Sequence, residues 1–244
     1  TVECLTPVYD QIPDIDVMYQ GYFSVVPYVI PGKYVAYAFS YTGGALMQWC
    51  TETLAKKEMQ LAKEQGISVN EYLEQSYASQ KEEIPSGLLV LPHFAGAATP
   101  YMDTGSKGAV LGLTTATTTA DIYRGCMEGV VYEMYLNMQA LQGSGIRFEK
   151  IHATGGGAHS EEWMQMKADM LNVPMVALKT VDAGTVGSAM LTGIAIGLFH
   201  DLQDAAFHMV EEIKTYEPRP AMHEKYMRIY EKYQNVYQAV RPLM

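Results

Sequence analysis

Seven consecutive residues decide how this sequence is interpreted: Thr154-Gly155-Gly156-Gly157-Ala158-His159-Ser160. They follow a short apolar stretch at 151–153, which predicts a strand, and they precede a helical pattern at 161–171. Three adjacent glycines remove every Cβ atom between a ligand and the backbone, and they allow successive N–H groups to point one way as an anion-binding nest. The helix that follows adds unpaired N–H groups and the positive end of its dipole. The stretch therefore predicts a strand-to-helix turn that binds phosphate.

Two interpretations of this turn are open from the residues alone. The glycines could form a phosphate cradle, or they could only make a tight turn between strand and helix. Ser160 fits the N-cap of the helix, and it also fits a hydroxyl donor to a ribose or phosphate oxygen. The turn is not a Walker loop, because no Gly-Lys-Ser/Thr ending follows, and it is not a dinucleotide fingerprint, because the GxGxxG spacing is absent.

The elements around the turn predict an α/β fold with a mixed β-sheet flanked by helices. Strand patterns occur at 22–30, 33–40, 88–91, 108–113, 150–153 and 175–178. Helical patterns occur at 45–65, 69–78, 121–141, 161–171, 185–199 and 221–240. Because no repeat or long linker interrupts them, we expect one domain over residues 1–244, with a helical insertion left open at 56–86.

Composition and charge exclude several classes of protein. The chain of 244 residues is 48% hydrophobic and 18% charged, which is typical of a globular domain. Its net charge of -10 argues against a nucleic-acid partner, whereas backbone N–H groups can still bind a nucleotide locally. The three cysteines lack metal-ligand spacing, so we expect buried free thiols in a cytoplasmic protein. The apolar stretch 186–199 is too short to span a membrane and predicts a buried helix packed through small residues.

Several blocks of sequence carry a resemblance to a known family. They read YTGGALMQW at 41–49, GAVLGL at 108–113, DIYRGCMEG at 121–129, GGGAHSEEWMQ at 155–165, ADMLNVPM at 168–175 and DAGTVGSA at 182–189. In this order they resemble the C-terminal domain of the FGGY carbohydrate kinases over nearly the whole chain. That family has two actin-like lobes, so the resemblance implies an actin-like (ribonuclease-H-type) ATPase lobe.

The resemblance also implies an ATP site with two parts. The glycine triplet would approach the α- and β-phosphates or the ribose, and Ala158 and Ser160 would lie beside the nucleoside. Gly44 would bring a second helix start close to the nucleotide, with Gln48 facing the same cleft one turn further on. Thr1 would contact the γ-phosphate if it ends the family's Gly-Thr element. The candidate ATP-binding residues are Thr1, Gly44, Gln48, Gly155, Gly156, Gly157, Ala158 and Ser160.

The reaction implied for the whole protein is transfer of the γ-phosphoryl group of ATP to a sugar or polyol hydroxyl, with Mg²⁺ as the metal. Such a reaction needs a carboxylate that accepts the hydroxyl proton. In the family this carboxylate precedes the Gly-Thr element, so we expect the base before Thr1, and neither a catalytic residue nor a metal-ligand set within this chain. Asp10, Asp14 and Asp16 are interpreted as loop carboxylates.

A sugar-binding N-terminal lobe would then be the partner of this chain, which alone would be inactive. A homodimer is left open, and we expect neither nucleic acid nor a membrane as a partner. The alternative function is a non-catalytic actin-like module that binds nucleotide as a sensor or assembly partner. For Gly44 and Gln48 the alternatives are a plain strand-to-helix turn and a solvated helix residue.

The remaining polar and aromatic residues receive structural interpretations. Arg124 and Glu128 lie four residues apart and predict an ion pair on a helix. His152 is expected in the core, and Asp103 in a turn. Trp163 and the tyrosine stripe at 226–237 are expected to pack against the body of the domain.

Overall fold

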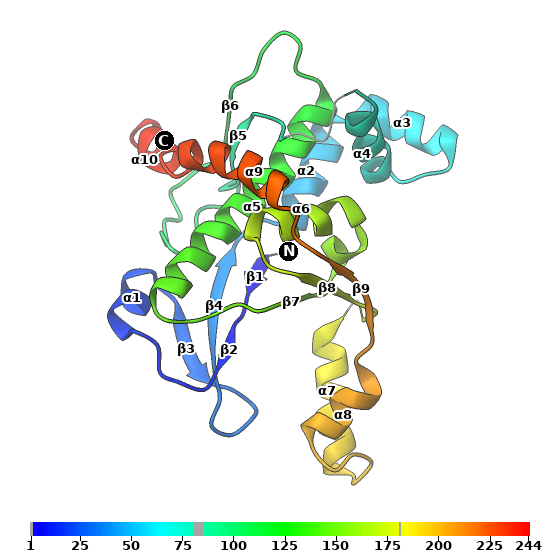
Figure 1. The fold of residues 1–244 in the computed structure, drawn as a ribbon. Helices are drawn as coiled ribbons and strands as arrows, with labels where there is room; N and C mark the ends of the chain where they lie inside the picture. The colour runs from blue at the N-terminus through cyan, green and yellow to red at the C-terminus, as the bar shows by residue number, and fades with distance from the viewer. Residues whose placement is uncertain (1, 81–84, 181) are drawn as a thin grey trace.

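The computed structural model describes residues 2–80, 85–180 and 182–244, and Figure 1 shows their arrangement. The helices are α1 (Ile15–Gln20), α2 (Gly44–Leu54), α3 (Lys56–Gln65), α4 (Val69–Gln80), α5 (Thr119–Gly143), α6 (Glu161–Leu171), α7 (Ala183–Ala195), α8 (Leu202–Met209), α9 (Pro220–Tyr233) and α10 (Val236–Val240). The strands are β1 (Glu3–Leu5), β2 (Val8–Tyr9), β3 (Ser24–Pro27), β4 (Tyr34–Ser40), β5 (Leu89–Leu91), β6 (Ala109–Leu111), β7 (Ile151–Ala153), β8 (Met175–Leu178) and β9 (Glu212–Tyr216).

The strands pair in both senses. Strand β4 is antiparallel to β1, β2 and β3, and β5 is antiparallel to β6. Strand β7 is parallel to β8, with Ile151 opposite Met175, and β9 is antiparallel on the other edge of β8. Helices flank these strands (Figure 1), which confirms the α/β class with mixed sheet.

The predicted hairpin forms, although its first strand is shorter than expected. Residues of β3 pair with β4 from Ser24 opposite Tyr37 to Pro27 opposite Tyr34. The connecting turn needs Gly32, whose φ of +77° is a conformation that L side chains rarely adopt. The first predicted strand is shortened because the chain around Tyr22 enters from α1 rather than in extended conformation.

Helix α5 is the central element of the domain. It begins with a capping box, in which Thr118 Oγ1 accepts the N–H of Asp121 at 3.2 Å and Asp121 Oδ2 accepts the N–H of Thr118 at 2.8 Å. Helices α2, α4 and α6 and strand β5 all pack on it. Most of its residues are buried, which is expected for a helix surrounded by partners rather than lying on a surface.

Two glycines let α5 approach β5 closely. A Cβ atom on Gly129 would lie 2.3 Å from the carbonyl oxygen of Val90, and one on Gly125 would lie 3.1 Å from a Val90 methyl group. The helix can therefore pack directly on the backbone of β5 only because these positions lack a side chain.

Two long predicted helices are each divided in the structure. The pattern at 45–65 becomes α2 and α3, which meet at the fully buried Ala55. The pattern at 221–240 becomes α9 and α10. As expected, Tyr226, Tyr230 and Tyr233 are buried, and they lie on the side of α9 that packs toward the body.

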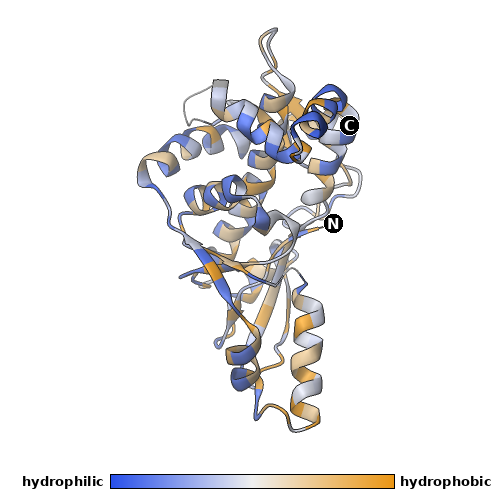
Figure 2. Ribbon diagram, turned by 90° about the vertical axis from the view of Figure 1, so that its right-hand side faces the viewer, coloured by the Kyte–Doolittle hydropathy of each residue, from blue (hydrophilic) through white to orange (hydrophobic). Residues whose placement is uncertain are grey.

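The expectation of a buried helix at 186–199 is wrong. In α7 and the turn after it, Leu191, Ile196 and Leu198 are 50%, 75% and 67% exposed. The small residues serve a different contact, because the Phe199 ring occupies the space beside Gly193. Helix α7 packs on α8, and the pair extends from the body with several hydrophobic residues along it (Figures 1 and 2). Among the described residues, no helix combines the length and the apolar character needed to cross a bilayer.

The close packing of α5 on β5 generates a prediction with a control in the same helix. We expect Gly129→Ala to destabilise the protein by about 1–3 kcal/mol, because the new methyl group overlaps backbone that cannot move aside. Gly143→Ala, where nothing lies within 4 Å of the new methyl group, should range from neutral to about 1 kcal/mol stabilising. Urea unfolding of both variants measures the difference, and equal stabilities would contradict the observed packing.

Candidate functional site

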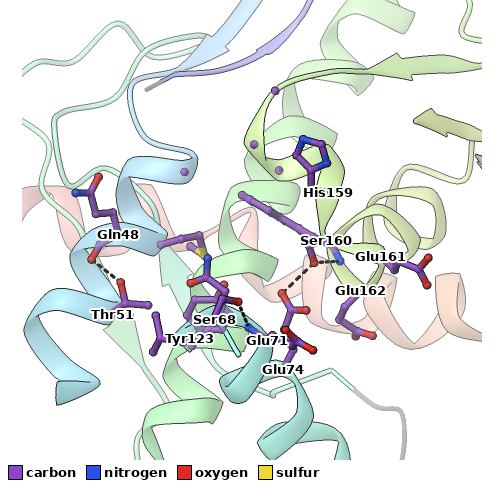
Figure 3. A pocket seen from close by; sticks show the side chains of 18 of the residues that line it. Gln48, Thr51, Ser68, Glu71, Glu74, Tyr123, His159, Ser160, Glu161 and Glu162 are labelled. Carbon is purple, nitrogen blue, oxygen red and sulfur yellow. Dashed lines mark hydrogen bonds between the residues drawn. The ribbon is translucent and has the colours of Figure 1, made fainter. Parts of the chain in front are cut away.

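A pocket of about 970 Å³ brings together segments that are far apart in the sequence. The start of α2, the glycine turn before α6 and one face of α4 line it (Figure 3). The predicted residues that line it are Gly44, Gln48, Gly155, Gly156, Gly157 and Ser160. Ala158 does not line it, because its side chain packs on the core behind the turn. Thr1 lies outside the described residues.

The three glycines of the turn have different structural requirements. Gly155 has φ +88° and ψ -178°, a combination essentially restricted to glycine. Gly157 leaves room for the ring of Trp163, which would lie 3.1 Å from a Cβ atom. Gly156 meets neither restriction, and nothing lies within 4 Å of its Cβ position. The fold therefore explains Gly155 and Gly157, whereas Gly156 lines the pocket without either requirement.

The hydroxyl group of Ser160 is occupied twice. It accepts the N–H of Trp163 at 3.0 Å as the N-cap of α6, and it donates to Glu74 Oε1 at 2.9 Å. Of the two roles that the sequence left open for Ser160, the structure shows the N-cap. The bond to Glu74 links α6 to α4 across the pocket (Figure 3).

The start of α2 lies across the pocket from the glycine turn, and unlike the start of α6 it has no side-chain N-cap. Gly43 occupies its N-cap position, and no side chain there accepts a hydrogen bond from the first turn. The N–H groups of Leu46 and Met47 donate to the Gly43 carbonyl, so those of Gly44 and Ala45 are the ones that can receive an anion. Gln48, one turn further on, is exposed and donates to Glu52 Oε1 at 2.8 Å.

The face of α4 is the part of the site that sequence reasoning missed. Ser68, Glu71 and Glu74 line the pocket from this helix, with Tyr123 of α5 behind them. Ser68 and Glu71 were recognisable as a helix start, and the Ser68 hydroxyl accepts the N–H of Glu71 at 3.1 Å. Nothing local indicates that this helix faces the glycine turn, because that contact depends on how α4 packs on α5.

The charges around the pocket are mostly negative. Five carboxylates line it: Glu3, Glu71, Glu74, Glu161 and Glu162. Among the described lining residues, Lys167 is the only lysine or arginine. Burial raises the pKa of Glu74, an effect that the Ser160 hydrogen bond partly opposes and the nearby Glu162 reinforces. Within the described residues, no group of three or more His, Cys, Asp and Glu side chains could hold a metal ion.

Behind the pocket, the predicted pair of Arg124 and Glu128 is confirmed, with Nε 3.1 Å from Oε1. The same guanidinium also donates to Glu162 on α6. The expectation that His152 lies in the core is wrong. Its side chain is 41% exposed and bonds to Glu212 on β9, a strand that the sequence did not predict.

The aspartates that the sequence analysis singled out lie in contacts outside the pocket. Asp10 pairs with Lys33 at 3.0 Å, and Asp14 caps α1 by accepting two backbone N–H groups. Asp16 lies within α1 rather than in a loop, which corrects that interpretation. Asp103 bonds to Tyr237 and Arg241 at the other end of the chain. None of these four lines the pocket.

The sequence pattern of the FGGY family of carbohydrate kinases, C-terminal domain, matches residues 5–196. The chain belongs to this family. A xylulose kinase of Staphylococcus epidermidis is 27% identical over a region that covers 88% of this chain. A glycerol kinase of Koribacter versatilis is 31% identical over a region that covers 77% of this chain. The solved structure of a xyloylose kinase from Brucella ovis superposes on 100% of the chain with a TM-score of 0.81 at 22% identity.

These similarities confirm the actin-like ATPase fold that the motifs implied. They also show that the FGGY chain is shorter than its relatives. It spans 41% of the length of the Staphylococcus protein, 36% of the Koribacter protein and 47% of the Brucella chain.

The raised pKa of Glu74 generates a pH prediction. Below the ordinary pKa of a glutamate the carboxyl is protonated in both the folded and unfolded states, so it imposes no penalty. As the pH rises through the raised folded-state value, the folded protein loses stability relative to a neutral side chain. Glu74→Gln, which can still accept from Ser160, should therefore unfold at a higher temperature than the parent at pH 7 and at a similar one at pH 4.

The control for this experiment is Glu224→Gln on the exposed surface of α9, which removes one negative charge outside the pocket. Thermal unfolding at both pH values would show whether the gain is specific to position 74. A stability difference for Glu74→Gln that shrinks as the pH rises would contradict the cause assigned here.

Proposed function

We propose that this chain is the ATP-binding lobe of a carbohydrate kinase, and that the whole protein transfers the γ-phosphoryl group of ATP to a hydroxyl group of a sugar or polyol. The observation that carries the proposal is the convergence of two backbone segments on one pocket, namely the open turn at Gly156 and the uncapped start of α2 at Gly44. Helix starts bind phosphate through backbone N–H groups, so an acidic protein can use them. The family membership gives these segments a ligand, since its named relatives are kinases.

The charges of the pocket support one orientation of the nucleotide. Three lining carboxylates are neutralised by ion pairs, namely Glu3 with Lys167, Glu161 with Lys214 and Glu162 with Arg124. Among the described residues, Glu71 and Glu74 on α4 form no ion pair, so they would repel phosphate groups most strongly, and the triphosphate lies against the glycine turn and the start of α2. The adenine base then points toward α4, where carboxylate oxygens can accept from its amino group. Thr1 lies outside the described residues, and its contact with the γ-phosphate is proposed only from the family resemblance. Ala158 contributes through its backbone, which donates to Gly155 O at 3.1 Å and closes the turn.

Mg²⁺ would reach this site together with ATP. It prefers oxygen ligands and commonly keeps several waters, with one or two carboxylates and phosphate oxygens completing its shell. The described residues fit such a metal rather than one held by a protein cage, because their carboxylates do not form a preassembled ligand group. The metal would neutralise part of the negative charge of the phosphate groups.

The sugar and the general base would come from an N-terminal lobe. Asp10, Asp14 and Asp16 do not line the pocket, and Glu3, which does, is paired with Lys167 at 2.5 Å. The exposed hydrophobic side chains of the α7–α8 pair, such as Ile196 at 75% and Phe207 at 83%, offer a surface for that lobe. The relatives are more than twice as long as this chain, so their remaining length accommodates such a lobe. We infer a cytoplasmic location, because the three cysteines are free thiols and the expected donor is ATP.

The glycine turn offers a direct test of nucleotide binding. Gly156→Ala adds a methyl group in open space and should leave stability unchanged or raise it by up to about 1 kcal/mol. Because Gly156 lines the pocket, we expect the same methyl group to lower ADP affinity about 10-fold or more. Gly155→Ala, in contrast, should destabilise the protein by about 1–3 kcal/mol, because alanine rarely adopts the backbone conformation of this position.

Calorimetric titration with ADP, together with denaturant unfolding, separates the two effects. If Gly156→Ala binds ADP as tightly as the parent, the turn is only a structural connection and the nucleotide lies elsewhere.

The activity of the whole protein is tested by a phosphorylation screen over pentuloses, hexuloses and tetritols with ATP and Mg²⁺. We expect one class of these compounds to be phosphorylated by the full-length protein, and this chain alone to be inactive because it lacks the base. Turnover by the isolated chain, or no turnover by the full-length protein on any of them, would count against the proposed reaction.

A further inference from the structure

A buried ion pair lies in the pocket between its two backbone segments. Lys167 Nζ on α6 lies 2.5 Å from Glu3 Oε1 on β1, and the two side chains are only 5% and 17% exposed. Both residues line the pocket. The lysine side chain runs back toward the start of its helix, as helical side chains do, and so reaches the glycine turn.

The pair is adjacent to the glycines on both sides. A Cβ atom on Gly157 would lie 3.7 Å from Lys167 Nζ, and a Cβ atom on Gly43 would lie 3.0 Å from Glu3 Oε2. A ligand atom that approaches the backbone at Gly157 therefore also approaches the ammonium group. The two segments assigned to the phosphates are connected by this pair.

The ammonium group can form further hydrogen bonds. It has three N–H donors, of which Glu3 Oε1 accepts one, while the ring of Trp163 lies 4.6 Å from Nζ. Among the described residues, Glu3 provides its only hydrogen-bond acceptor. A phosphate oxygen at the glycine turn could accept a second N–H without displacing Glu3.

A purely structural role does not account for this pair well. Burying a lysine and a glutamate costs several kcal/mol in desolvation, and apolar side chains of similar size commonly stabilise a contact at least as well. Five carboxylates line the pocket, and Lys167 is the only lysine or arginine among the described lining residues. A nucleotide with two or three phosphates therefore has one cationic side chain available to it here.

We propose that Lys167 binds a phosphate oxygen of the nucleotide and that Glu3 positions its ammonium group beside Gly157. The inference rests on the proposed function, because it assigns a further contact within the same nucleotide site. Lys167 then distinguishes ADP and ATP from adenosine, which has no phosphate to accept its N–H.

The test compares two single variants whose effects should be opposite. In the full-length protein, Lys167→Met should lower ADP affinity about 10- to 100-fold, the loss expected for one charge-assisted hydrogen bond, while adenosine affinity changes less than about 2-fold. Glu3→Gln keeps an amide oxygen that can accept from and position the ammonium group, and it removes a negative charge, so ADP affinity should be unchanged or higher. A structural pair would instead respond in the same way to loss of either partner.

Two further variants control the measurement. Glu3→Gln combined with Lys167→Met leaves no unpaired buried charge, so it should fold, and it should bind ADP as weakly as Lys167→Met. Lys179→Met breaks an exposed pair of the same type, in which Nζ lies 2.7 Å from Glu211, and should leave ADP affinity unchanged. Calorimetry with ADP and with adenosine, without metal, provides all affinities.

The outcomes distinguish the inference from the function on which it rests. Parent-like ADP affinity in the double variant, or equal losses in the two single variants, overturns the role of Lys167. A parent protein that binds neither ADP nor adenosine overturns the nucleotide site itself.

Discussion

The arrangement of the pocket depends on one buried guanidinium group. Arg124 is 5% exposed, and its Nε donates to Glu128 at 3.1 Å within α5. Its other nitrogens donate to Glu162 on α6 and, at 2.7 Å, to the hydroxyl of Tyr226 on α9, while Tyr77 of α4 lies 5.1 Å from the guanidinium carbon. An uncompensated charge in this place would cost several kcal/mol. Each of the helices α4, α6 and α9, which supply these partners, therefore stabilises the positions of the other two around α5.

Two of these helices are walls of the pocket, so the guanidinium has a direct consequence for binding. With α4 and α6 fixed, Ser160 can bridge to Glu74 while also capping α6. The first turn of α6 is thereby partly satisfied by its own cap, whereas that of α2 at Gly44 has no side-chain cap. The two helix starts differ in the acceptor of the third N–H group, which is the Gly43 carbonyl for Leu46 of α2 and the Ser160 hydroxyl for Trp163 of α6. In both helices the first two N–H groups remain available for an anion.

A helix, strand or contact could be predicted from the sequence where residues close together in the chain determine it. Helix α6 and strand β8 occur within the predicted bounds, because an N-cap serine, an apolar period and an αL residue at Asn172 mark their ends. The i,i+4 pair of Arg124 and Glu128 is local in the same sense. Strand β9 was missed because its residues are mostly exposed and polar, and it forms by pairing with β8. His152 was misassigned for the same reason, since its environment includes that strand.

The parts of the candidate site also differ in whether local sequence or long-range packing determines them. The glycine turn and the start of α2 were identifiable because a glycine indicates, at its own position, a backbone conformation or a close approach that other residues do not allow. The α4 wall was not identifiable, and neither was the Glu3–Lys167 pair, whose members are separated by 164 positions along the chain. A lysine within an amphipathic helix is ordinarily solvated, whereas Lys167 is buried against Glu3 of β1 and the ring of Trp163. These contacts also resolve how a chain of net charge -10 can receive a polyanion. At physiological salt, charges farther away than about 8 Å are largely screened, so the local groups decide. In the proposed binding mode, backbone donors and the ammonium group of Lys167 lie beside the phosphates, and the carboxylates of Glu71 and Glu74 disfavour phosphate at the α4 wall.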